Sequence, residues 1–73
     1  MKIRTTFNQN EIEIAADKEG LKYLSDICLK LSNLSESEAM TPANHYHLLE
    51  GFRNLEKGSI STVILYDIDL EKA

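Results

Sequence analysis

Hydrophobic residues along the chain follow two spacings, one typical of strands and the other of a helix. Residues 2–7 and 11–16 alternate apolar and polar positions, which is the period of half-buried strands. The polar break between them, Asn8-Gln9-Asn10, favours a tight turn, so the two runs predict a β-hairpin. Basic residues of the first run would share a solvent face with acidic residues of the second, which would stabilise the pairing slightly.

The longest periodic segment, residues 17–34, predicts one amphipathic helix. Apolar side chains recur there at helical spacing, and they are Leu21, Leu24, Ile27, Cys28, Leu31 and Leu34. Asp17 is a suitable N-cap, because its carboxylate can accept from a free backbone N–H of the first turn. Since one side of the helix is apolar, we expect it to cover one face of a sheet. Cys28 lies within the apolar stripe and is expected to be buried as a small hydrophobe.

The helix is followed by a polar segment, residues 35–43, which predicts a surface connection. Ser35 and Glu38 have the spacing of a capping box, which allows one short extra helical turn. Thr41 precedes Pro42 and is therefore expected to be extended, which ends any helix there.

Two further segments predict strands. Residues 44–49 alternate in polarity, and residues 60–68 carry apolar side chains on both faces, which indicates a central or covered strand. The glycine-punctuated stretch between them, residues 50–59, predicts a loop. Two apolar residues of this loop are expected to contact the edge of the core, namely Phe52 and Leu55. The polar residues 69–73 predict a frayed tail.

The order β-β-α-β-β predicts an α+β fold, a four-stranded and mostly antiparallel sheet with one helix packed on one face. A length of 73 residues predicts a single small α+β domain over residues 1–73. The core of such a small domain leaves little margin of stability, so self-association or a partner would help to cover apolar surface.

Charge and composition narrow the class of partner. Twelve acidic residues against eight basic ones give a net charge of −4, which disfavours nucleic acid and anionic membrane surfaces as partners. No apolar run approaches the length of a membrane span or a signal peptide, so we expect a cytoplasmic protein. The chain has one cysteine, which excludes an intramolecular disulfide.

The face of the sheet opposite the helix is the candidate interaction site. It is expected to carry histidines and apolar residues from the third and fourth strands, namely His45, His47, Leu49, Val63 and Leu65. A mixed apolar and histidine surface is typical of a partner-binding face, either for a second copy or for a different protein. The alternative is that loops or the tail shield this face.

His45 and His47 are alternate residues of a strand and could approach one metal ion, but two ligands are too few for a firm site. We therefore interpret them as structural or interface histidines and predict neither a metal nor another cofactor. The sequence also lacks a glycine-rich phosphate loop, a CxxC pair and an HExxH motif. No catalytic residue is predicted, and the protein is not expected to be an enzyme.

Three stretches together resemble a family of short bacterial immunity proteins, which protect cells from polymorphic toxins. They are the strand-to-helix entry at residues 12–21, the His45-Tyr46-His47-Leu48 strand, and the Gly58-Ser59 step into residues 60–65. The resemblance implies a cytoplasmic, non-enzymatic protein that binds and neutralises a cognate toxin. It supplies no catalytic residue and does not identify the toxin.

Two functions from different classes follow from these observations. The first is a protein-binding module of the immunity type, which predicts an exposed complementary face. The alternative is a small homodimer that binds a metal or small ligand through His45 and His47, with the histidines of two copies converging at the interface. A structural subunit of a larger complex cannot be separated from the first by sequence.

Overall fold

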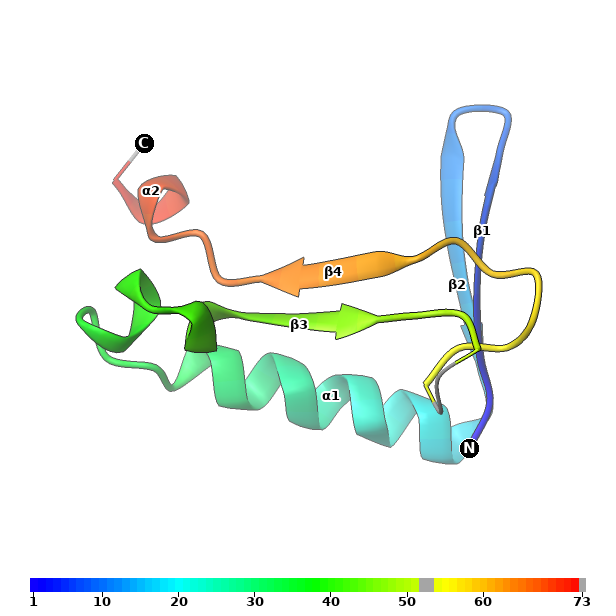
Figure 1. Cartoon of the computed structure of the whole chain (residues 1–73), viewed down its shortest axis with the longest axis horizontal. Helices are drawn as coiled ribbons and strands as arrows, with labels where there is room; N and C mark the ends of the chain where they lie inside the picture. The colour runs from blue at the N-terminus through cyan, green and yellow to red at the C-terminus, as the bar shows by residue number, and fades with distance from the viewer. Residues whose placement is uncertain (52–53, 73) are drawn as a thin grey trace.

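The computed structural model describes residues 1–51 and 54–72, and it confirms the α+β class (Figure 1). A projecting hairpin, a long helix and a second strand pair follow one another along the chain. The elements are β1 (Ile3–Asn8), β2 (Glu11–Ala16), α1 (Lys18–Ser32), the 3-10 turns η1 (Glu38–Met40) and η2 (Pro42–Asn44), β3 (His45–Leu48), β4 (Thr62–Leu65) and α2 (Ile68–Glu71).

The strands form two separate antiparallel pairs, β1 with β2 and β3 with β4. The prediction of one four-stranded sheet therefore overstated the extent of the sheet. The chain leading into β4 does contact β1. The backbone N–H of Glu56 donates to the Ile3 carbonyl at 2.8 Å, and that of Ile60 donates to the Thr5 carbonyl at 2.9 Å. These two bonds tether the pairs to each other without continuing the ladder.

Between β1 and the chain leading into β4, side-chain hydrogen bonds replace the backbone bonds that a continuous sheet would have. The backbone N–H of Thr5 donates to the Ser59 hydroxyl oxygen at 3.2 Å, and the Thr5 hydroxyl donates to the Ile60 carbonyl. Thr5 is fully buried, so these bonds satisfy its polar groups inside the fold. The alternation of apolar and polar residues does not show that a hydroxyl group will replace a backbone partner. For this reason the sequence predicted a single sheet.

The β1–β2 turn is tighter than predicted, because it uses the two residues Gln9 and Asn10 rather than three. Their φ angles are 51° and 65°, the left-handed pair required by a type I′ turn. This turn matches the natural twist of the strands, and the hairpin projects well beyond the body of the protein (Figure 1).

The start of α1 confirms the predicted cap. The Asp17 carboxylate accepts from the backbone N–H of Gly20 at 2.7 Å and from that of Lys2 at 3.1 Å. These bonds stabilise the charged carboxylate and lower the pKa of Asp17 below its ordinary value of 3.8. Gly20 is buried, and a Cβ atom there would lie 2.6 Å from the Lys2 carbonyl oxygen. Glycine at this position therefore allows the helix to approach β1 closely.

The core lies between α1, the base of the hairpin and β3. Its buried members come from all three elements and from the loop after β3, and they are Ile3, Ile27, Leu31, Leu48 and Leu55. The predicted contact of Leu55 with the core is confirmed, whereas Phe52 lies outside the described residues.

The buried side of α1 is rotated from the one predicted. Ile27 and Leu31 are buried, but Leu21 is 55 % exposed and Cys28 is exposed, so the prediction of a buried cysteine was wrong. The elements that pack on the helix determine which of its side chains are buried, and Ile27 and Leu31 share one buried cluster with Leu48 of β3. Periodicity alone cannot choose among adjacent lines of a broad apolar stripe.

The connection after α1 contains the predicted capping box. The Ser35 backbone N–H donates to the Glu38 carboxylate at 2.9 Å, and the Glu38 N–H donates to the Ser35 hydroxyl at 3.2 Å. The backbone N–H of Ser35 and, to a smaller extent, its side chain favour the ionised carboxylate and lower the pKa of Glu38. Thr41 is extended at φ −112° and ψ 169°, as predicted for a residue before proline, and η2 begins at Pro42.

The last strand is shorter than the predicted range 60–68, and β4 spans Thr62–Leu65. The chain then turns into α2 rather than fraying. The Asp67 carboxylate caps α2 by accepting from the Asp69 N–H at 3.0 Å. The Tyr66 N–H donates to the Asn44 carbonyl at 2.9 Å, which holds the end of β4 beside the start of β3.

Candidate functional site

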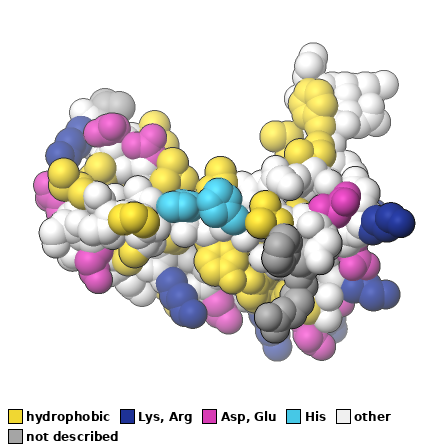
Figure 2. Space-filling view, in the orientation of Figure 1, with side chains coloured by type: hydrophobic (Ala, Val, Ile, Leu, Met, Phe, Trp, Pro, Cys, Tyr) yellow, Lys and Arg dark blue, Asp and Glu magenta, His cyan; other side chains and the backbone are white. Residues whose placement is uncertain are grey.

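The predicted interaction residues of β3 and β4 lie together on one side of their strand pair. His45 is directly opposite Leu65, and His47 is directly opposite Val63. We call these four residues the histidine face. Val63 and Leu65 are 51 % and 50 % exposed, and Figure 2 shows the two histidines side by side over β3 with hydrophobic side chains nearby. The open apolar surface that the alternation predicted is present.

Leu49, the fifth residue predicted for this face, lies just beyond the end of β3. It is half-buried, and its backbone N–H donates to the Asn54 side-chain oxygen at 3.0 Å. The loop after β3 therefore anchors Leu49, and we do not include it in the histidine face.

The orientation of His45 is set by its neighbour Asn44. The Asn44 amide nitrogen donates to the Ala39 carbonyl at 3.1 Å, which directs the amide oxygen toward His45. That oxygen lies 2.9 Å from Nδ1 of His45. Because an amide oxygen only accepts, Nδ1 carries the proton and Nε2 keeps its lone pair in the neutral ring.

The other side of β3 faces α1. The hydroxyl oxygens of Tyr23 and Tyr46 are 2.6 Å apart, and their rings meet edge to face with centroids 6.0 Å apart. This hydrogen bond is the main reason that the pKa of Tyr46 is raised above 10.0. A groove of about 250 Å³ lies beside this pair, and its lining is mainly apolar: Tyr23, Asp26, Ile27, Lys30, Leu31, Leu34, Ala43, His45 and Tyr46.

The hairpin presents a second exposed apolar surface that the sequence interpretation missed. Phe7 is 58 % exposed, Ile12 opposite it is 70 % exposed, and Ile14 is 50 % exposed. The alternation of apolar and polar residues predicted that this side of the hairpin would be covered. Within residues 1–51 and 54–72, the hairpin joins the core at its base, through Ile3 and Ala16, and the outer half of that face stays exposed.

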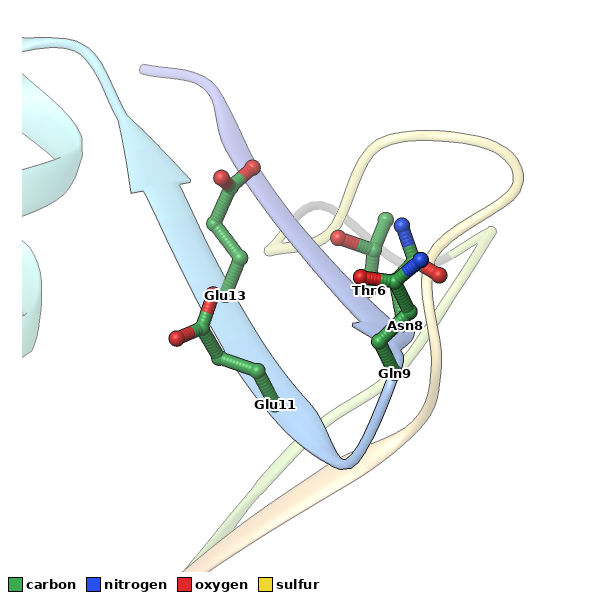
Figure 3. Close-up of a pocket in the computed structure, with 5 residues that line it drawn as sticks. All are labelled: Thr6, Asn8, Gln9, Glu11 and Glu13. Atoms are coloured by element: carbon green, nitrogen blue, oxygen red, sulfur yellow. The ribbon is translucent and has the colours of Figure 1, made fainter.

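The opposite side of the hairpin is polar. Glu11 and Glu13 project from β2 beside Thr6 and Asn8 of β1 and Gln9 of the turn (Figure 3), around a shallow hollow of about 290 Å³. Within residues 1–51 and 54–72, the ion pairs involve Met1 with Asp17 and Glu19, and Lys72 with Glu36. The predicted cross-strand charge pairs of the hairpin are therefore not formed.

Neither a metal cluster nor a membrane span is apparent in the part of the chain that the structure describes. No three or more histidine, cysteine, aspartate or glutamate side chains converge there in a way that could hold a metal ion. Over the same residues, no helix has both the length and the apolar character needed to cross a membrane.

Comparison with known proteins identifies the family. A family model described as Immunity protein 32 matches residues 11–67, a segment that runs from β2 to the cap of α2. No curated protein and no solved structure matches the chain. The matched segment includes α1 and the whole histidine face, and it covers well over half of the sequence. The chain belongs to the Immunity protein 32 family.

Proposed function

We propose that this protein binds a cognate bacterial toxin and neutralises it by occupying its surface, without turnover, in the cytoplasm of the cell that it protects. Membership of the Immunity protein 32 family is the observation that carries the proposal. An immunity protein that acts by complex formation needs an exposed complementary surface rather than a catalytic centre.

The histidine face is the surface that we assign to the toxin. It combines two half-exposed aliphatic side chains, Val63 and Leu65, with two imidazoles that can accept or donate hydrogen bonds. Surfaces of this composition suit the centre of a protein interface, where apolar contacts exclude water around a few polar groups. All four residues also lie within the segment matched by the family model.

Charge supports a basic toxin surface as the counterpart. The chain carries a net charge of −4, and acidic side chains such as Glu11 and Glu13 are exposed on the projecting hairpin. An acidic protein and a basic partner attract each other before contact, which raises the association rate more than the final affinity.

The proposal is tested with the product of a toxin gene adjacent to the gene for this chain. Val63→Glu places a charge at the centre of the histidine face and should weaken toxin binding by about tenfold or more, as measured by calorimetry. Cells that produce this variant together with the toxin should lose protection.

Ile12→Glu is the matched control, because it places the same charge on an exposed apolar residue of the hairpin. It should leave the affinity for the toxin nearly unchanged. A loss of affinity with Ile12→Glu but not with Val63→Glu would contradict the assigned surface. A toxin that fails to bind the wild-type chain at all would contradict the function itself.

A further inference from the structure

We infer that His45 and His47 form half of a zinc site, which a second copy of this chain completes. The second copy would occupy the face that we assign to the toxin, so the dimer and the toxin complex would exclude each other. The test uses the chain and zinc alone, so this inference can fail while toxin binding holds, and the reverse. The inference rests on the spacing of the two imidazoles, on the partner of His45, and on the number of ligands that one chain provides.

The spacing of the two rings matches that of two ligands on one zinc ion. Zinc binds imidazole nitrogen at about 2.0–2.1 Å in tetrahedral geometry, which places the centroids of two bound rings about 5 Å apart. The ring centroids of His45 and His47 are 4.9 Å apart, and the ring planes are inclined by 86°. Alternate residues of a strand give this arrangement without a change in the backbone.

His45 is already held as metal-binding histidines are. Its Nδ1 donates to the Asn44 side-chain oxygen, and Asn44 is fixed in turn by the Ala39 carbonyl. A histidine that ligates a metal through one nitrogen commonly donates its other N–H to such an acceptor, which fixes the tautomer and orients the ring. In this arrangement Nε2 of His45 is the ligating atom.

One chain provides too few ligands. Zinc takes four, and within residues 1–51 and 54–72 no third histidine, cysteine or carboxylate joins the pair. A second copy related by a twofold axis through the metal would supply two more imidazoles, which completes a four-histidine tetrahedron. The same twofold contact would cover Val63 and Leu65, the exposed apolar neighbours of the histidines.

The composition of the histidine face permits a second copy to approach it. The four residues of the histidine face carry no carboxylate, so two copies can approach there without bringing like charges together. The net charge of −4 opposes self-association elsewhere on the surface, and the dication lowers this repulsion at the contact.

The test is a titration of the metal-free full chain with zinc chloride, followed by calorimetry and by sedimentation velocity. We expect one zinc per two chains and a zinc-dependent change from a monomer of 8.3 kDa to a dimer. His45→Ala with His47→Ala should abolish both the binding and the dimer. Asn44→Ala should weaken zinc binding about tenfold or more, because it releases the orientation of His45. Circular dichroism will verify that each variant is folded.

Cys28→Ser is the control, because Cys28 is an exposed thiol and therefore the other strong zinc ligand of the chain. This variant should bind zinc and dimerise as the wild type does. Loss of zinc binding in Cys28→Ser would overturn the inference. Uptake of one zinc per chain without dimerisation would also overturn it, as would a dimer that persists in the presence of EDTA.

Discussion

The hydroxyl groups of Tyr23 on α1 and Tyr46 on β3 share a hydrogen bond of 2.6 Å at the rim of the groove between these elements. The bond connects the helix to the strand whose opposite side carries His45 and His47. The position of the histidine face relative to the core is therefore fixed in part by a polar contact on the far side of β3.

Replacement of Tyr23 by phenylalanine should lower the pKa of Tyr46. The hydrogen bond to Tyr23 is the largest cause that raises this pKa above 10.0, because it stabilises the protonated phenol. Titration of the tyrosine ring carbons by NMR measures the change residue by residue. Tyr66→Phe is the control, since the Tyr66 hydroxyl interacts with Glu71 instead. An unchanged Tyr46 titration in Tyr23→Phe would show that the two hydroxyls are not bonded in solution.

Gly20→Ala should destabilise the protein although alanine favours helices. The gain in helix propensity is at most about 1 kcal/mol, whereas forcing atoms into a packed site typically costs about 1–3 kcal/mol. The new Cβ would meet the Lys2 carbonyl oxygen at 2.6 Å, and that oxygen already accepts from the Asp17 N–H. We expect a net loss of about 1–2 kcal/mol in urea unfolding.

Ser25→Ala provides the matched comparison, because it introduces alanine at an exposed position of the same helix. It should be neutral or slightly stabilising. Equal effects of the two substitutions would mean that the helix does not approach β1 as closely as the structure shows.

Asp17 should contribute to the loss of stability in acid. Its pKa is lowered in the folded protein, so its contribution is complete above the ordinary value of 3.8 and is lost as the pH falls through the lower folded value. Asp17→Asn keeps a capping side chain but removes the titrating group. The melting temperature of this variant should therefore fall less steeply between about pH 5 and pH 2 than that of the wild type. Parallel curves for the two proteins would contradict this account.

The sequence predicted those elements whose cause is local. The alternation of residues 2–7 and 11–16, the cap at Asp17 and the box of Ser35 and Glu38 all act over a few residues, and each appears in the structure. The sequence also predicted that His45 and His47 lie on one side with Val63 and Leu65, because strand alternation and register determine this grouping.

What the sequence could not supply depends on distant contacts. Cys28 is exposed because the core cluster takes Ile27 and Leu31 from the helix instead, and no local pattern reveals that choice. Among the residues that the structure describes, the outer half of the hairpin is exposed because the core meets the hairpin at its base, at Ile3 and Ala16. β4 ends before residue 68 because Asp67 caps α2, and it begins after residue 60 because Ile60 bonds to Thr5 of β1.

The bonds that join Thr5 to Ser59 and Ile60 have a consequence for biosynthesis. The hairpin can form from local contacts as soon as its own residues leave the ribosome, but the core closes only after a segment more than fifty residues later has been synthesised. Until then, Ile3 and the apolar side of α1 have only part of their final cover, which Leu48 and Leu55 complete. The contacts of Thr5 are therefore completed only after Ile60 has left the ribosome, and the early hairpin is the species that chaperones would meet.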